Sequence, residues 1–272
     1  MKLKMKQSIL EYLRVEKDIP SVDYLKKLVT AYCNTVPWES LSRILRKVKF
    51  INPEKCIKLE NEFWNDAMKL GTGGTCYESN LAFEFLLKSL GFETYLTINK
   101  IKDKSSLHSA IIVSINSKKY IVDIGYPLYA PIPINKNKVS VIQLNQIEYR
   151  STYLSDEKYL IENYPHPKPY LYHLTDKPIY SKEYLKICVE DYGENGLFLD
   201  RIIMRKVKKG IPTRFDSEDL PFNIHLLQNG QKSKQLLDEE KMILTLSEYY
   251  NMNIDIIKEV FKLQTTKTKA EK

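Results

Sequence analysis

The chain has 272 residues, of which 43% are hydrophobic, and a formal net charge of +8 at pH 7. No apolar run approaches the ~18 residues of a membrane span, and charged residues close to Met1 exclude the apolar core of a signal peptide, so we expect a soluble cytoplasmic protein. The positive charge comes mostly from scattered lysines, without an arginine-rich stripe, so nucleic acid is not an expected partner. A basic surface would suit an anionic ligand such as a phosphorylated cofactor.

Cysteine and histidine are few and scattered. The cysteines are Cys33, Cys56, Cys76 and Cys188, and they form no CxxC pair. No two of the four histidines have the spacing of metal ligands on one helix. In a chain of this length without a secretion signal, free thiols are the expected state. We therefore expect free cysteines and no metal site.

The N-terminal third is predicted to be helical. A short helix around residues 11–13 ends before Pro20, and Ser21 then caps a second helix whose apolar residues recur at helical spacing. Pro37 ends that helix, because proline cannot continue it. A further helical piece is expected within residues 52–70, ending at a glycine.

After this helical third, the apolar period changes to that of strands. Strands are expected at residues 94–98, 109–115, 119–124, 139–144, 148–154, 159–162, 170–174, 184–189 and 197–207. Short strands separated by turn residues favour an antiparallel barrel or curled sheet. Helices are expected again at 238–250 and 254–261. The last residues, 264–272, are polar without an apolar period, and we expect them to be disordered.

Residues 71–80, Gly-Thr-Gly-Gly-Thr-Cys-Tyr-Glu-Ser-Asn, have the form of a glycine turn that leads into a helix. The helix continues through residues 81–90, is apolar on nearly every side and ends at Gly91, so it is predicted to be buried. Cys76 would lie in its first turn, where unpaired N–H groups and the positive end of the helix dipole stabilise a thiolate. The alternative is a small buried cysteine after an ordinary glycine loop.

A predicted hairpin brings His108 and Asp123 together. With residues 116–117 as a two-residue turn, the apolar residues of both strands share a core face, and His108 lies opposite Gly125 with Asp123 as its diagonal neighbour. Diagonal neighbours are roughly 7–8 Å apart at Cα, within reach of long side chains. A three-residue loop would place Asp123 on the wrong face. The alternative is that His108 merely ends a loop and Asp123 merely precedes a turn.

The three residues fit one chemical scheme. Cys76 would be the nucleophile, and His108 would take its proton and hold it as imidazolium. Asp123 would orient and stabilise the imidazole ring. Thiolate–imidazolium chemistry of this kind suits acyl transfer through a thioester.

The sequence resembles the arylamine N-acetyltransferases in four segments that occur in the same order. The family's Arg-Gly-Gly-x-Cys-x-Glu motif is similar to residues 72–78, Thr-Gly-Gly-Thr-Cys-Tyr-Glu, and its Pro-Phe-Glu-Asn segment to residues 37–40, Pro-Trp-Glu-Ser. The histidine strand resembles residues 108–113, and the Asp-Val-Gly-Phe-Gly segment resembles residues 123–127, Asp-Ile-Gly-Tyr-Pro. The resemblance covers most of the chain and is strongest in residues 12–131.

The resemblance implies an α+β fold with a cysteine-protease-like or transglutaminase-like core. Its parts would be an N-terminal helical bundle with the nucleophile cysteine, a central antiparallel β-barrel with the histidine and aspartate, a C-terminal α/β lid and a disordered tail. The expected bounds are 1–93, 94–207, 208–263 and 264–272.

The implied reaction is ping-pong acetyl transfer. Acetyl-CoA acylates Cys76, CoA leaves, and an arylamine, arylhydrazine or arylhydroxylamine takes the acetyl group, as in xenobiotic metabolism. Acetyl-CoA is then a co-substrate, and no permanently bound cofactor is expected. The resemblance also implies that Ser106, Leu107, Gly125 and Tyr126 contact CoA. The lysines just before His108 would either meet the CoA phosphates or belong to a solvated charged loop.

Two departures from the family pattern bear on the acyl donor and acceptor more than on the triad. Thr72 stands where the motif has arginine, and Pro127 stands where the family usually has a glycine near the cofactor cleft. In the family that arginine lies close to the Phe-Glu-Asn segment, so we expect Glu39 to find another hydrogen-bond donor here. The alternatives to acetyl transfer are an amide synthase or thioester hydrolase with the same triad, and a catalytically silent binding protein.

Overall fold

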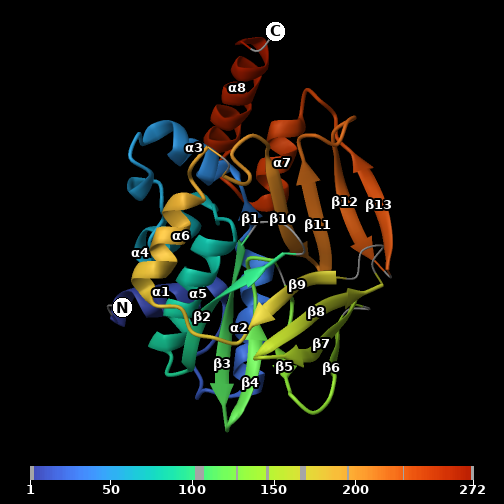
Figure 1. Cartoon of the computed structure of the whole chain (residues 1–272). Helices are drawn as coiled ribbons and strands as arrows, with labels where there is room; N and C mark the ends of the chain where they lie inside the picture. Colours follow the sequence, from blue (N-terminus) through green and yellow to red (C-terminus); the bar gives the residue numbers. More distant parts are fainter. Residues whose placement is uncertain are drawn as a thin grey trace.

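The computed structural model describes residues 3–101, 107–126, 128–144, 147–165, 170–194, 196–228 and 230–270. Helices of the N-terminal third lie beside an eight-stranded sheet that curls into a nearly closed barrel, and a five-stranded sheet with the last helices forms the remaining part (Figure 1). The predicted α+β order of helices, barrel and mixed C-terminal part is confirmed.

The N-terminal helices follow the local signals in the sequence. They are α1 (Leu3–Leu13), α2 (Val22–Thr35), α3 (Leu41–Lys49), the short 3₁₀ helix η1 (Pro53–Lys55), α4 (Glu60–Leu70) and α5 (Cys76–Ser89). The hydroxyl of Ser21 caps α2 by accepting a hydrogen bond from the backbone N–H of Tyr24. Helix α4 ends at Gly71, whose backbone is left-handed with φ of 67°, a conformation that glycine adopts without strain.

The barrel sheet is antiparallel, with strand order β5-β4-β3-β2-β9-β8-β7-β6. Its strands are β2 (Glu93–Lys100), β3 (Leu107–Ile115), β4 (Lys118–Val122), β5 (Ile132–Ile134), β6 (Ser140–Leu144), β7 (Ile147–Ser155), β8 (Lys158–Tyr164) and β9 (Tyr170–Thr175). Strand β5 at one edge also lies near β6 and β7 at the other, which nearly closes the barrel. Helix α5 packs on β2 and β3 from outside the barrel.

The β3–β4 hairpin has the predicted register. Ile111 pairs with Val122 and Ile115 with Lys118. Residues 116–117 form the turn, and both have left-handed backbones, with φ of 48° and 61°, as the favoured two-residue hairpin turn requires. One face of the hairpin packs against the helical core and the other faces the barrel interior.

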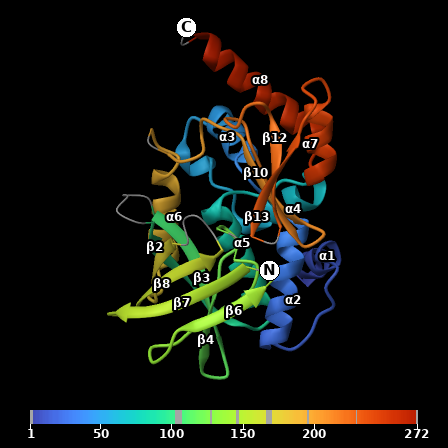
Figure 2. The ribbon, with the colours of Figure 1, turned by 90° about the vertical axis from the view of Figure 1, so that its right-hand side faces the viewer.

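The five-stranded sheet has the order β1-β10-β11-β12-β13 and joins distant parts of the chain. Its strands are β1 (Trp38–Glu39), β10 (Ile203–Lys208), β11 (Ile211–Asp216), β12 (Asn223–Gln228) and β13 (Gln231–Leu236). Helices α7 (Met242–Tyr250) and α8 (Ile254–Ala270) share a hydrophobic core with this sheet and α3. Figure 2 shows this part above the barrel, with the end of α8 pointing away from both.

Two sequence-based expectations for the C-terminal half were wrong. Residues 184–189 lie in helix α6 (Ser181–Glu190), because Tyr184 and Cys188 recur at helical spacing and are buried together. Of the predicted strand 197–207, only the part from Ile203 onward is extended, in β10. Helix α8 extends to Ala270, and the disordered tail expected at 264–272 stays a prediction.

Among the described residues, the buried hydrophobic side chains form three clusters, one each for the helices, the barrel interior and the C-terminal part. Helix α6 contributes Tyr184 and Cys188 to the helical cluster although it follows the barrel in sequence. Strand β10 begins before residue 208 yet belongs to the C-terminal sheet. The division of the chain at residues 93, 207 and 263 stays a prediction. All four cysteines are free, as expected.

Candidate active site

The loop before Cys76 is held by the segment that contains β1. A Cβ atom on Gly73 would lie 1.8 Å from the carbonyl oxygen of Pro37, so only glycine fits there. The backbone N–H of Glu39 donates to the carbonyl oxygen of Gly74 at 3.3 Å. These contacts fix the path of the chain into α5, of which Cys76 is the first residue.

The side chain of Glu39 is fully buried and accepts three hydrogen bonds. One comes from the N–H of Gly73 at 3.0 Å, and two come from the N–H and hydroxyl of Ser42 at 2.8 and 2.5 Å. The expectation that Glu39 finds other donors is confirmed. A buried cation still lies beside Thr72, because the Lys58 ammonium donates to the Thr72 hydroxyl at 3.4 Å and to the Gly73 carbonyl at 2.9 Å.

His108 and Asp123 meet as the hairpin register predicts. Nε2 of His108 lies 2.6 Å from Oδ2 of Asp123, and both side chains are buried. The other oxygen, Oδ1, accepts hydrogen bonds from the N–H groups of Gly125 and Tyr126 at 2.9 and 2.8 Å and from Nδ2 of Asn80 at 3.2 Å. The carboxylate is therefore fixed in one orientation toward the imidazole.

Cys76 lies directly against the turn that follows Asp123. A Cβ atom on Gly125 would lie 2.5 Å from Cα and 2.7 Å from Cβ of Cys76, so this close approach requires glycine. The hydroxyl of Ser109 donates to the carbonyl oxygen of Cys76 at 2.9 Å. These contacts hold the first turn of α5 against β3 and the turn, and the side chain of Cys76 is half-buried.

Asp123 and Cys76 together raise the pKa of His108. Burial by itself lowers this pKa, but the charge of Asp123, its hydrogen bond, and the hydrogen bond and charge of Cys76 outweigh burial and raise the pKa to about 10. The imidazole is therefore protonated at neutral pH. A cysteine that hydrogen-bonds to an imidazolium is the arrangement that favours a thiolate nucleophile.

The sequence analysis did not identify Asn80, which ties α5 to β3 and to the turn that follows β4. Its Nδ2 also donates to the carbonyl oxygen of Ser109 at 2.8 Å, and its Oδ1 accepts from the N–H of Ile124 at 3.2 Å. Asn80 follows Cys76 by four residues, so helical spacing puts both on one face. The Asn80 amide is fully buried, and its four-residue spacing from Cys76 is the sequence signal that could have identified it.

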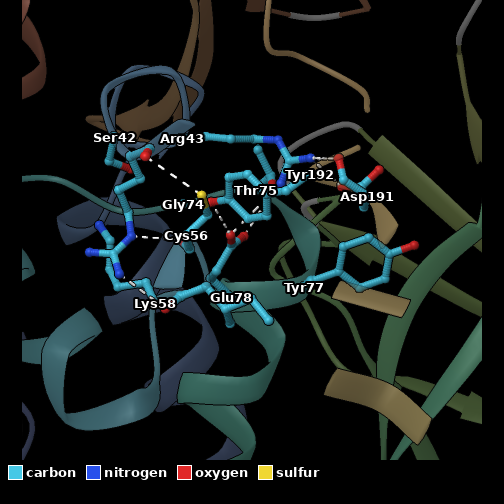
Figure 3. A network of polar contacts seen from close by, with 12 residues as sticks. Ser42, Arg43, Cys56, Lys58, Gly74, Thr75, Tyr77, Glu78, Asp191 and Tyr192 are labelled. Carbon is cyan, nitrogen blue, oxygen red and sulfur yellow. Dashed lines mark hydrogen bonds and ion pairs between the residues drawn. The ribbon is translucent and has the colours of Figure 1, made fainter. Parts of the chain in front are cut away.

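A second missed group is a charge network around Glu78, in the first turn of α5 (Figure 3). Figure 3 shows the Arg43 side chain extending toward Asp191, with the Tyr192 ring and the Glu78 carboxylate beside it. The guanidinium lies 2.6 Å from the Asp191 carboxylate, 3.8 Å from that of Glu78 and 4.0 Å above the Tyr192 ring. Glu78 also accepts hydrogen bonds from the hydroxyls of Tyr192 at 2.8 Å and Thr75 at 3.0 Å.

The network ionises Glu78 despite its burial. Burial alone would raise the pKa of this carboxyl, but the charge of Arg43 and the hydrogen bonds it accepts hold its pKa below the ordinary value. Burial dominates at Asp191 and raises its pKa to about 6, with Arg43 acting in the opposite direction. Because Glu78 lies two residues after Cys76, the network fixes the start of α5 from the side opposite His108 and Asp123.

A cavity of about 330 Å³ adjoins the site between the barrel and the five-stranded sheet. Tyr126 lines it, and the ring of Tyr126 makes an edge contact with the His108 ring at 5.9 Å between centroids. A larger groove of about 1000 Å³ lies between η1 and α6. None of Cys76, His108 and Asp123 lines either space, but only the smaller one includes Tyr126, which contacts His108. Proximity to the histidine makes the smaller cavity the candidate substrate site.

The residues expected to contact CoA are only partly placed. Gly125 lies against Cys76, Tyr126 lines the cavity, and Leu107 is the half-buried first residue of β3. Ser106, together with the lysine-containing segment 102–106, lies outside the described residues, as does Pro127. Within the described ranges, no helix is long and apolar enough to cross a membrane, and no group of three or more acidic, cysteine or histidine side chains could hold a metal ion.

Comparison with known proteins adds independent findings. A family model described as N-acetyltransferase matches residues 21–260. An uncharacterized acetyltransferase of Acanthamoeba polyphaga mimivirus is 28% identical over 162 residues, which span 50% of this chain and 76% of that protein. An arylamine N-acetyltransferase of Escherichia coli strain K12 is 27% identical over 122 residues, or 41% of either chain. The arylamine N-acetyltransferase of Mycobacterium marinum, solved in complex with CoA, shares the fold with a TM-score of 0.80 and 17% identity, over 95% of this chain and 97% of that one.

Proposed function

The chain belongs to the arylamine N-acetyltransferase family, and from this premise we propose that it transfers acetyl from acetyl-CoA, through a thioester on Cys76, to an aromatic amine. The acceptor class is an arylamine, arylhydrazine or arylhydroxylamine, and acetyl-CoA is a co-substrate. The observation that carries the proposal is the contact of 2.6 Å between Nε2 of His108 and the Asp123 carboxylate, with Cys76 packed against the turn that follows Asp123. We further propose a cytoplasmic location and a role in xenobiotic metabolism, both from family membership.

The first half-reaction needs a nucleophile and an acid. The thiolate of Cys76 attacks the acetyl carbonyl carbon, a new C–S bond forms, and the bond between that carbon and the CoA sulfur breaks. His108 gives its proton to the departing sulfur, so CoA leaves as a thiol and the imidazole becomes neutral. Asp123 keeps the ring oriented during this proton transfer through its contact with Nε2.

The second half-reaction needs a base at the same place. The amine nitrogen attacks the thioester carbonyl, the neutral imidazole takes a proton from that nitrogen, and Cys76 leaves as a thiolate. Acetylation removes the hydrogen bond and the charge interaction with Cys76, both of which raise the pKa of His108. The ring can therefore accept a proton in the acetylated enzyme, and product release restores the initial ion pair.

The proposal gives a kinetic prediction. With acetyl-CoA and a neutral amine such as 4-methoxyaniline, double-reciprocal plots at several amine concentrations should be parallel, because the two substrates react with different enzyme forms. CoA release without an amine should stop after one equivalent. Intersecting lines would contradict a thioester intermediate, and continuous CoA release without an amine would identify a thioester hydrolase instead.

A further inference from the structure

The cavity beside the triad has aromatic walls. Tyr126, Tyr129 and Tyr149 contribute to its lining, and its volume of about 330 Å³ falls in the range of sites for small ligands. A flat aromatic ring can stack against such walls. Basic side chains also line the cavity. Whether each of them has a carboxylate partner indicates whether the cavity can bind an anionic group.

Two of the half-buried basic side chains that line this cavity have acidic partners. Arg214 pairs with Asp216 and Asp219, and His225 lies 2.9 Å from Asp219. Arg205 makes no ion pair and no side-chain hydrogen bond with any residue in the described ranges, and its Nε is buried without a partner.

The guanidinium of Arg205 is held in place by aromatic rings instead of by charge. It lies over the rings of Trp38 and Tyr126, at 5.1 and 5.7 Å from their centroids. Burial lowers the pKa of Arg205, and the nearby Arg214 acts in the same direction. The Nε of Arg205 is shielded from solvent without a partner, which is costly, and a bound anion would satisfy the guanidinium with charge-assisted, two-pronged hydrogen bonds.

The position of Arg205 connects it to the reaction centre. Arg205 pairs with Trp38 across β10 and β1, and Trp38 forms a bridge with Gly74, two residues before Cys76. On the other side, Tyr126 contacts both Arg205 and the ring of His108. A ligand group at Arg205 is therefore separated from the triad by about one aromatic side chain.

We infer that Arg205 recognises an anionic group on the acceptor, so that the preferred acceptors are carboxylate-bearing aromatic amines. This inference rests on the proposed acetyl transfer. The other source of an anion is CoA, but its long pantetheine arm separates the phosphates from the sulfur that reacts at Cys76. An anionic group next to the triad belongs on a short molecule, and an aromatic ring of that molecule matches the tyrosine walls.

The test compares a charged and a neutral ligand of the same shape, 4-aminobenzoate and 4-aminobenzamide. Calorimetry without acetyl-CoA measures their binding independently of turnover, and kcat/KM with acetyl-CoA measures their transfer. Arg205→Gln should weaken binding and kcat/KM for 4-aminobenzoate by roughly 10- to 100-fold, since a hydrogen bond to a charged group has about that effect. The same values for 4-aminobenzamide should change less than about threefold.

Two further variants keep the result interpretable. Arg205→Lys retains the charge and should keep part of the preference for the carboxylate. Arg150→Gln removes an exposed arginine from the barrel surface. It should change neither the binding nor the kcat/KM of either ligand. Each variant is judged by the ratio of its values for 4-aminobenzoate and 4-aminobenzamide. Poor folding would lower both values equally and leave this ratio unchanged.

Each other outcome overturns the inference. Equal losses of binding and kcat/KM for both ligands would make Arg205 a structural residue. If the wild-type protein does not prefer 4-aminobenzoate over 4-aminobenzamide, Arg205 does not recognise the carboxylate. A raised Kd for CoA in Arg205→Gln, with unchanged binding of 4-aminobenzoate, would assign the anion to the CoA phosphates. Failure of the proposed function looks different, because Cys76 would then not be acetylated whichever amine is used.

Discussion

Replacing Asp123 with Asn should lower kcat for acetyl transfer about 1,000- to 10,000-fold while the protein remains folded. An Asn side chain retains one oxygen for the N–H groups of Gly125 and Tyr126. Its amide would then face Nε2 of His108 as a donor, where the native carboxylate accepts at 2.6 Å. The imidazole would lose the acceptor that orients its ring and the charge that stabilises its protonated form.

The pH dependence of stability checks the same interaction. The pKa of His108 is raised from 6.5 to about 10, so its contribution to stability is fully present below pH 6.5 and is lost as the pH rises through about 10. The unfolding free energies of wild type and Asp123→Asn should therefore differ most below pH 6.5 and converge toward pH 10. Asp23→Asn, at an exposed carboxylate on α2, is the matched control. Activity within tenfold of wild type in Asp123→Asn would refute the role assigned to this carboxylate.

Replacing Arg43 with Met should destabilise the fold by about 3–5 kcal/mol at pH 7, because it leaves buried carboxylates without their cation. The Arg43 side chain is 2% exposed and lies between Glu78 and Asp191. Methionine fills much of the same volume, so the loss would report the unpaired charges more than a cavity. Chemical denaturation of Arg43→Met beside Arg150→Met, which removes an exposed arginine, would measure the effect.

The loss of unfolding free energy in Arg43→Met should become smaller as the pH falls. The charge of Arg43 is a main reason that the pKa of Glu78 lies below its ordinary value, and burial already raises the pKa of Asp191 to about 6. Without the arginine, both carboxyls would take up protons more readily in the folded state, so acid would relieve the unpaired charge. A destabilisation that does not shrink between pH 7 and pH 5 would instead point to lost packing.

The parts of the site that the sequence predicted depend on local patterns. The two-residue turn at 116–117 and the alternation of apolar residues set the hairpin register that brings His108 to Asp123. The glycine turn and the apolar helix after it placed Cys76 at a helix start. Both signals act between neighbours in the chain, so a pattern in the sequence can carry them.

What the sequence did not predict depends on distant partners or on polar surface strands. Arg43, Glu78 and Asp191 come from three separate helices or their ends, and no local pattern shows that their charges meet. Strand β13 is exposed along its whole length and has no apolar alternation, so it carries no strand signal. The pairing of β1 with β10, which brings Arg205 to Trp38, likewise joins segments far apart in the chain.

Intact-mass measurement after mixing the purified protein with acetyl-CoA alone tests the central claim, that Cys76 carries the acetyl group. The account predicts one added acetyl group on the wild-type protein and none on Cys76→Ala. Subsequent addition of an aromatic amine should remove the adduct and yield the N-acetyl product. An absent adduct on the wild type, or an equal adduct on Cys76→Ala, would contradict the account.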